Sequence, residues 1–147
     1  MTDHPTLTME RTFDAPAERV FDAFTNEEVL RRWFHAGPDW ETPEARADVR
    51  IGGEVRVVMR NPHEQVNYGG RGTYTEIDPP RRLAFTWLWD DDIDQVEQMI
   101  EIDFTESDGR TKMRFVHRDL WDEEAVASHE GGWTNAFDNL QREVESG

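Results

Sequence analysis

The chain opens with a short segment in which apolar and polar residues alternate. In residues 6–13, TLTMERTF, the side chains of Leu7, Met9 and Phe13 share one face with Arg11, and the other face is polar. An alternation with a period of two predicts a half-buried β-strand.

The apolar spacing then changes to a helical one. Residues 14–34 carry two short apolar stripes, each preceded by residues that favour a helix start. Asp14 is a candidate cap for the first helix and Pro16 suits its first turn, whereas Thr25 or Asn26 can cap the second. Two short helices are therefore expected directly after the first strand.

From about residue 45 the period returns to two. Short turns separate the predicted strands, with Gly52–Gly53 and Asp108–Gly109 as turn centres and residues 61–70 as a loop. The strands are expected in residues 45–60 (two strands), 71–77, 82–89, 95–104 and 111–117.

The last segment, residues 119–145, returns to helical spacing. Asp119 or Asp122 can cap it, and its apolar stripe predicts one long helix. That stripe contains Ala125, His129, Trp133, Ala136, Leu140 and Val144.

This order of elements indicates an α+β fold. Strands joined by short turns pair antiparallel, and the helices then cover one face of the sheet. We expect a single domain over residues 1–147, in which a curved sheet of about six to seven strands packs against the long C-terminal helix.

Composition removes several classes of function. The 147 residues include no cysteine, which excludes disulfides, thiolate metal sites and cysteine nucleophiles. The net charge of −16 opposes binding to nucleic acid or to anionic membranes. No apolar run is long enough for a membrane span, and we expect a cytoplasmic protein.

Five segments together resemble a known family. They are RTFDAPAERVFDAFTNEEVLRRWF, DVRIGGEVRVVM, GTYTEIDPPRRLAFTW, the strand TKMRFVH and GGWTNAFDNL. In this order they are similar to the START-like, or SRPBCC, superfamily. The resemblance is greatest to the branch named after the activator of the heat-shock-protein-90 ATPase, and it spans about residues 6–145.

The resemblance implies a helix-grip fold with an apolar cavity between the sheet and the C-terminal helix. It also implies a chaperone ATPase as one possible partner. It leaves the activity open, since the superfamily includes ligand binders, enzymes and protein-interaction modules.

Aromatic residues gather on the faces expected to enclose this cavity. In LAFTWLW the side chains of Phe85, Trp87 and Trp89 share one face, which fits either a filled core or the wall of a ligand pocket. We predict a pocket lined by Trp33, Phe34, Met59, Tyr74, Phe85, Trp87, Trp89, Gln98, Ile100, Phe115, His117, His129, Trp133 and Phe137.

Four polar residues are expected to point inward among these apolar ones. His117 and His129 are either structural histidines or polar anchors and acid–base groups of the pocket, and Glu76 is a third acid–base candidate. Arg11 is expected to pair with Glu76 or Glu101, or else to bind a carboxylate of the ligand.

No metal site and no cofactor are expected. Asp90, Asp92, Asp94 and Glu101 match four ligand positions of a calcium loop, but Gln95 stands where that loop needs glycine, so we interpret the run as a solvated turn. Two histidines without a third ligand do not form a zinc site.

Gly131 and Gly132 interrupt the long helix, at a cost of about 1 kcal/mol each relative to alanine. Either the helix packs closely against the sheet at this point, or it bends there to admit a ligand.

Three functions remain open at this level. The chain binds a small apolar or aromatic molecule, or it is an enzyme acting on such a molecule, or it is a protein-interaction module. A homodimer is plausible in each case.

Overall fold

A curved antiparallel sheet forms the framework of the computed structural model. Within residues 4–37, 39–91 and 96–146, which the structure describes, seven strands pair in the order β1-β7-β6-β5-β4-β3-β2. The strands are β1 (Leu7–Phe13), β2 (Glu41–Ala47), β3 (Glu54–Asn61), β4 (Val66–Asp78), β5 (Arg82–Trp89), β6 (Gln98–Ser107) and β7 (Arg110–Arg118).

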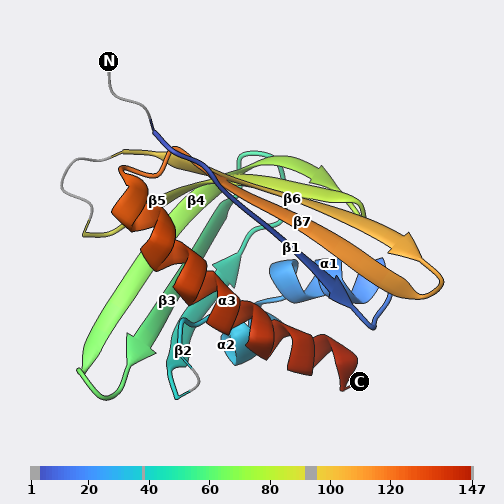
Figure 1. Cartoon of the computed structure of the whole chain (residues 1–147), viewed down its shortest axis with the longest axis horizontal. Coiled ribbons are helices and arrows are strands. Elements are labelled where there is room, and N and C mark those ends of the chain that lie inside the picture. Colours follow the sequence, from blue (N-terminus) through green and yellow to red (C-terminus); the bar gives the residue numbers. More distant parts are fainter. Residues whose placement is uncertain (1–3, 38, 92–95, 147) are drawn as a thin grey trace.

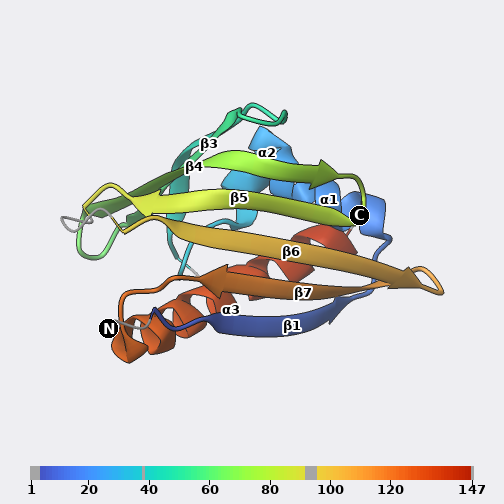
Figure 2. The same ribbon diagram turned by 90° about the horizontal axis from the view of Figure 1, so that it is seen from above.

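Three helices in the described residues lie on one side of this sheet: α1 (Ala17–Thr25), α2 (Glu27–Trp33) and α3 (Glu123–Glu145). Figure 1 shows α3 crossing the concave side of the curved sheet, and Figure 2 shows the strands lying over all three helices. The α+β helix-grip arrangement expected from the sequence is therefore confirmed. Over the same ranges, no helix combines the length and apolar character that crossing a bilayer requires.

Three of the predicted helix caps have clear outcomes. The side chain of Asn26 accepts hydrogen bonds from the backbone N–H groups of Glu28 and Val29, as expected for the start of α2. The prediction for Asp14 is wrong, because α1 begins after Pro16 and has no side-chain cap. At α3 the Asp122 carboxylate caps the N–H of Ala125.

Two strands are longer than the sequence pattern predicted. Residues 61–70 were expected to be a loop, but β3 continues to Asn61 and β4 begins at Val66, so only residues 62–65 form the turn. Gly70 pairs with Val57 within this ladder. A Cβ atom at Gly70 would lie 2.2 Å from Cζ2 of Trp87, so glycine stands here to admit the indole ring and not to break the strand.

A β-bulge in β4 reverses the direction of one predicted site residue. Tyr74 pairs with Phe85, but the register then shifts so that Glu76 pairs with Ala84. The extra residue turns Glu76 to the outer face, where it is exposed. The prediction that Glu76 points inward is therefore wrong, because strict alternation does not hold across a bulge.

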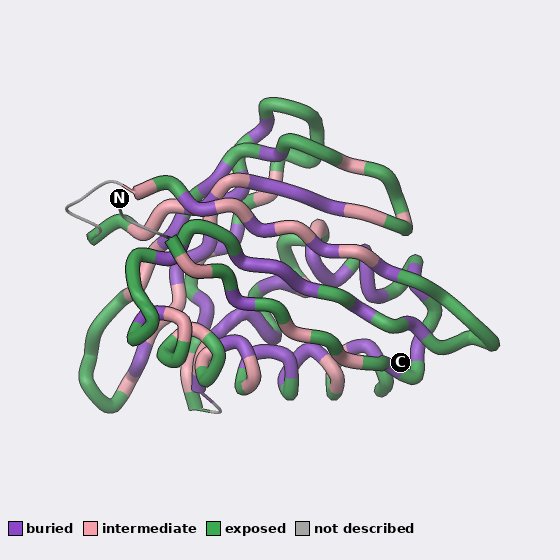
Figure 3. Tube along the Cα trace, turned by 45° about the horizontal axis from the view of Figure 1, so that its top comes forward, coloured by how far each residue is buried: buried purple, intermediate pink, exposed green. Residues whose placement is uncertain are grey.

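The inner face of the sheet is filled by large apolar side chains. Figure 3 shows buried positions alternating with exposed ones along most strands. The largest fully buried side chains include Trp33, Trp87, Phe115 and Phe137, which come from α2, β5, β7 and α3. The core thus lies between the concave face and the helices.

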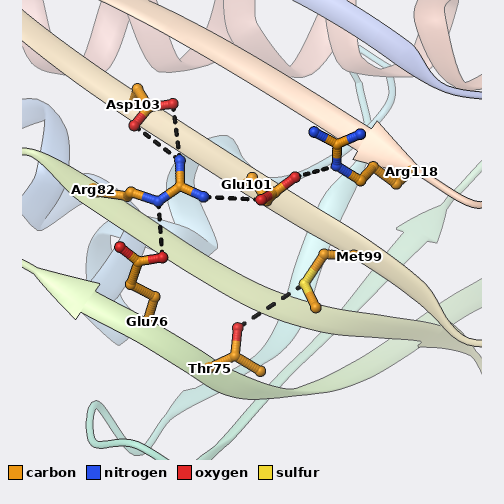
Figure 4. A network of polar contacts seen from close by, with 7 residues as sticks. All are labelled: Thr75, Glu76, Arg82, Met99, Glu101, Asp103 and Arg118. Carbon is orange, nitrogen blue, oxygen red and sulfur yellow. Dashed lines mark hydrogen bonds and ion pairs between the residues drawn. The ribbon is translucent and has the colours of Figure 1, made fainter.

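Arg82 links several carboxylates on the outer face of the sheet. Its guanidinium lies 2.9 Å from Glu76, 2.8 Å from Glu101 and 3.0 Å from Asp103. Arg118 contacts Glu101 from the other side (Figure 4). The hydrogen bond from Arg118, and then that from Arg82, lower the pKa of Glu101. The network thus holds acidic groups of β4 and β6 together through Arg82 of β5, the strand between them.

Replacing Arg82 by methionine should destabilise the fold, because three carboxylates would then face one another without a shared cation. We expect a loss of about 1–2 kcal/mol in the free energy of unfolding. Arg81→Met is the matched control, since the Arg81 side chain is 74% exposed and should change stability by less than about 0.5 kcal/mol. Urea denaturation at neutral pH measures both, and equal losses would contradict the role given to Arg82.

Gly70→Ala should also be destabilising, by about 2 kcal/mol, because the new Cβ atom overlaps the Trp87 ring. The same substitution at Gly131 meets no atom within 4 Å and should stabilise α3 by about 0.5–1 kcal/mol. Thermal unfolding of the two variants tests this contrast. A neutral effect at Gly70 would show that Trp87 can move aside.

Candidate ligand pocket

A pocket of about 560 Å³ lies where the N-terminal part of α3 faces the segment after α2 and the ends of β3, β4 and β5. Its described wall consists of Phe34, His35, Ala36, Trp40, Met59, Tyr68, Trp89, Asp91, Trp121, Ser128, His129, Gly132, Trp133 and Ala136. Aromatic side chains thus form much of the wall.

The segment that follows α2 contributes the first aromatic group of the wall. The ring of Trp40 stacks on that of Tyr68 in β4, with centroids 5.6 Å apart and planes 12° apart. Gly37 leaves room for this arrangement, because a Cβ atom there would lie 2.5 Å from the Trp40 ring. The stacked pair presents a flat aromatic surface to the pocket.

His129 of α3 connects the helix to the end of β5. The indole N–H of Trp89 donates to Nε2 of His129 over 3.0 Å, and Nδ1 of His129 donates to the carbonyl oxygen of Ala125 over 2.7 Å. Burial lowers the pKa of His129, against the opposing effect of the Ala125 hydrogen bond. His129 is therefore a neutral imidazole with both ring nitrogens engaged.

His117 lies behind the pocket and plays the same part for Trp133. The Trp133 N–H donates to Nδ1 of His117 over 3.2 Å, and Nε2 of His117 donates to Oε1 of Gln98 over 2.7 Å. Burial, and then the proximity of His129, lower the pKa of His117 to about 3. The two histidine rings lie 5.1 Å apart, centroid to centroid.

His35 is the third histidine of the site and differs from the other two. Thr42 donates its hydroxyl hydrogen to the carbonyl oxygen of Phe34 over 2.7 Å, so it must accept a hydrogen bond from Nδ1 of His35, 3.0 Å away. Burial, and then Arg142, lower the pKa of His35. Nε2 of His35 therefore keeps a lone pair, and no described residue donates to it.

The structure divides the predicted ligand residues into two groups. Phe34, Met59, Trp89, His129 and Trp133 lie on the pocket wall. The remaining ones are buried in the core and do not line it: Trp33, Tyr74, Phe85, Trp87, Gln98, Ile100, Phe115, His117 and Phe137.

Close aromatic packing explains why these residues do not enclose a cavity. Trp133 packs against Phe34, Phe115 and Phe137 with ring centroids 4.7–5.5 Å apart, which fills the space below the centre of the sheet. Phe34 also contacts Trp87, at 5.9 Å. The pocket therefore lies to one side of this packed core, and Trp89 is the residue of LAFTWLW that lines it.

Several wall residues were not identified from the sequence. Trp40 and Tyr68 belong to segments with no regular apolar period. Trp121, which is 41% exposed, precedes the apolar stripe of the predicted long helix. His35 follows the end of α2, and Asp91 follows the end of β5. The one available signal was the presence of aromatic residues in segments that looked like loops.

Arg11 has a partner other than those expected. Its guanidinium lies 2.8 Å from the Asp138 carboxylate and 3.1 Å from Oε1 of Gln141, both on α3. The predicted pairing with Glu76 or Glu101 is wrong, because α3 runs beside β1 whereas those glutamates lie on the outer face. Arg11 ties the edge strand to the helix and is absent from the pocket wall.

The described residues contain no group of three or more possible metal ligands. Asp90, the first residue of the calcium-like run, is bound by Arg56 and Arg71, which lie 2.9 and 3.0 Å away. The predicted turn residues Asp92, Asp94 and Gln95 lie outside the described residues.

The two helix glycines are not explained by close packing against the sheet. A Cβ atom at Gly131 meets nothing within 4 Å, and one at Gly132 lies at an ordinary 3.5 Å from Cβ of Ala36. Gly132 instead lines the pocket, so a larger side chain there would occupy its volume. The alternative, that the helix bends to admit a ligand, stays a prediction.

The curved sheet that grips α3 defines the chain as a START-like helix-grip protein. The family model described as Activator of Hsp90 ATPase homolog 1-like protein matches residues 14–145, and the chain belongs to this family. Comparison with curated proteins finds no match.

Solved structures support the same assignment. The AHSA1 protein from Silicibacter pomeroyi is 29% identical, with 95% of this chain and 97% of that chain covered and a TM-score of 0.82. The AHSA1-like protein from Aeromonas hydrophila is 25% identical, with 97% and 93% covered and a TM-score of 0.81. A Chromobacterium violaceum protein shares the fold at 22% identity, with 95% and 96% covered and a TM-score of 0.88.

The buried histidines should make the free energy of unfolding depend on pH below about 6.5, including pH values at which most carboxylates are still ionised. Unfolded His117 titrates near 6.5 and folded His117 near 3, so only the unfolded chain binds the proton between these values. The free energy of unfolding should therefore fall as pH decreases from about 6.5, by up to about 1.4 kcal/mol per pH unit from this residue.

Urea denaturation between about pH 6.5 and pH 5 measures this slope. His117→Gln should reduce the slope, whereas His4→Gln should leave it unchanged because His4 is exposed. Identical slopes for wild type and His117→Gln would contradict the assignment of this proton to His117.

Proposed function

We propose that the chain binds a small, largely apolar or aromatic molecule in the pocket beside α3. The observation that carries this proposal is the concave aromatic wall formed by Trp40, Tyr68, Trp89, Trp121 and Trp133. Such a surface has few polar groups to satisfy and can enclose a flat apolar molecule.

The size and chemistry of the pocket support this function. A volume of about 560 Å³ falls within the range of roughly 300–1,000 Å³ that is typical of small-molecule sites. His35, Asp91 and Ser128 add a few polar groups that can orient the ligand. Trp89 and His129 hydrogen-bond to each other, His129 also bonds to the Ala125 carbonyl, and Trp133 donates to His117. This part of the wall is therefore formed before a ligand arrives.

The enzyme alternative has less support at the residues first considered for it. Glu76 lies on the outer face, and both ring nitrogens of His117 and His129 already have hydrogen-bond partners. A general base needs a free lone pair within reach of its substrate. The interaction-module alternative, a homodimer, a chaperone partner and a cytoplasmic location stay predictions.

Filling the pocket from α3 should abolish ligand uptake without unfolding the protein. Gly132→Leu places its side chain in the pocket, whereas Gly131→Leu places the same side chain at an exposed position, where a Cβ atom meets nothing within 4 Å. Nile red, a neutral apolar dye, is a suitable probe, and its fluorescence should increase saturably with wild type and Gly131→Leu. Gly132→Leu should weaken binding by at least about tenfold.

Circular dichroism and thermal unfolding establish that both variants remain folded. Native mass spectrometry of protein purified without detergent complements the dye assay, because a mass excess lost on denaturation would reveal a bound molecule. Equal Nile red binding by Gly132→Leu and Gly131→Leu would reject this pocket as the site.

A further inference from the structure

The described wall of the pocket has an uneven distribution of charge. Asp91 is its one formally charged residue at neutral pH, and no arginine or lysine occurs among the described lining residues. His35 and His129 do not compensate, since burial lowers the pKa of each and leaves both rings neutral. The wall therefore carries negative charge with no counter-charge of its own.

Positive groups near this wall are already engaged. Arg56 and Arg71 both donate to the neighbouring Asp90, and Arg142, which lies close to His35, donates to Oδ1 of Asn139. The Arg142 hydrogen bond directs its guanidinium to α3, and Arg142 is not among the lining residues. An anionic ligand would thus meet Asp91 without a described cation on the wall to offset it.

Hydrogen bonds inside the site engage two of the donors on the wall. Trp89 and Trp133, two lining indoles, give their N–H groups to His129 and His117. His35 instead keeps the lone pair of Nε2, because its Nδ1–H is directed to Thr42. The wall also contains the donor groups of Trp40, Tyr68, Trp121 and Ser128, and its one charged acceptor, the Asp91 carboxylate, favours a cationic donor over an anion.

Aromatic faces add to this preference. The Trp40–Tyr68 stack, Trp89 and the partly exposed Trp121 lie around the same pocket as Asp91. The face of an aromatic ring carries partial negative charge and attracts a cation, most strongly for tryptophan. The net charge of −16 increases the local concentration of cations in the same sense.

We propose that the ligand of this pocket is an organic amine with an apolar body, bound as its ammonium ion against the aromatic faces and Asp91. The inference rests on the proposed function, because it assigns a charge to the ligand of the same pocket. The ammonium group pairs with the Asp91 carboxylate and the aromatic faces, and the apolar body fills the remaining volume.

Three probes that share an indole ring and differ in charge test this inference. They are tryptamine, a cation at neutral pH, tryptophol, its neutral alcohol, and indoleacetate, an anion. Isothermal titration calorimetry at low salt should show tryptamine binding about tenfold more tightly than tryptophol, with indoleacetate weakest.

Asp91→Asn removes the charge and keeps the shape of the side chain. It should weaken tryptamine about threefold or more and change tryptophol by less than about twofold. Asp108→Asn is the matched control, because Asp108 is exposed in the β6–β7 turn and does not line the pocket. It removes the same net charge and should leave the binding of all three probes unchanged.

Each other result has a defined meaning. Tryptophol or indoleacetate binding as tightly as tryptamine, or tryptamine indifferent to Asp91→Asn, overturns the amine inference and leaves the ligand pocket intact. Saturable Nile red binding without binding of any indole probe also overturns it. If neither the dye nor any indole probe binds, the proposed function itself fails.

Discussion

The position of Trp133 constrains the arrangement of the whole interior. Its ring touches Phe34 after α2, Phe115 on β7 and Phe137 one turn further along α3. A buried indole also needs an acceptor for its N–H, which His117 supplies. This single side chain therefore sets how closely the long helix approaches the sheet, and its aromatic neighbours fill the space beneath the sheet centre.

The location of the pocket follows from this packing. Where α3 faces the segment after α2, three of the lining residues are small: Ala36 of that segment, and Gly132 and Ala136 of the helix. Small side chains between two elements that aromatic packing already holds apart leave a volume that those elements cannot close. The cost of Gly132 in a helix is thereby linked to the space it leaves for a ligand.

The polar groups of the interior are arranged in a consistent way. His117 and His129 each accept an indole N–H and pass their own N–H to an oxygen, so they act as neutral connectors between α3 and the sheet. Three buried polar atoms have no hydrogen-bond partner within the described residues: Trp87 Nε1, Tyr74 Oη and Gln98 Nε2. Ion pairs lie elsewhere, on the outer face and along the edge strand, where water lowers the cost of charge.

The sequence alone determined the order of the elements, the antiparallel sheet and the helix that covers it, because periods of two and of about 3.6 residues follow directly from backbone geometry. It also identified the aromatic residues of the interior and the inward direction of His117. It could not separate core from pocket wall, since Trp87 and Trp89 share one face and differ only in what lies opposite them. That partner is Phe34, after α2, for Trp87 and His129, on α3, for Trp89. The tertiary structure alone decided the direction of Glu76, the partner of Arg11 and the contribution of Trp40, Tyr68 and Trp121. These features depend on a bulge, on the crossing of a helix and on the meeting of distant segments. All three arise from contacts between residues far apart in the chain, which local periodicity cannot predict.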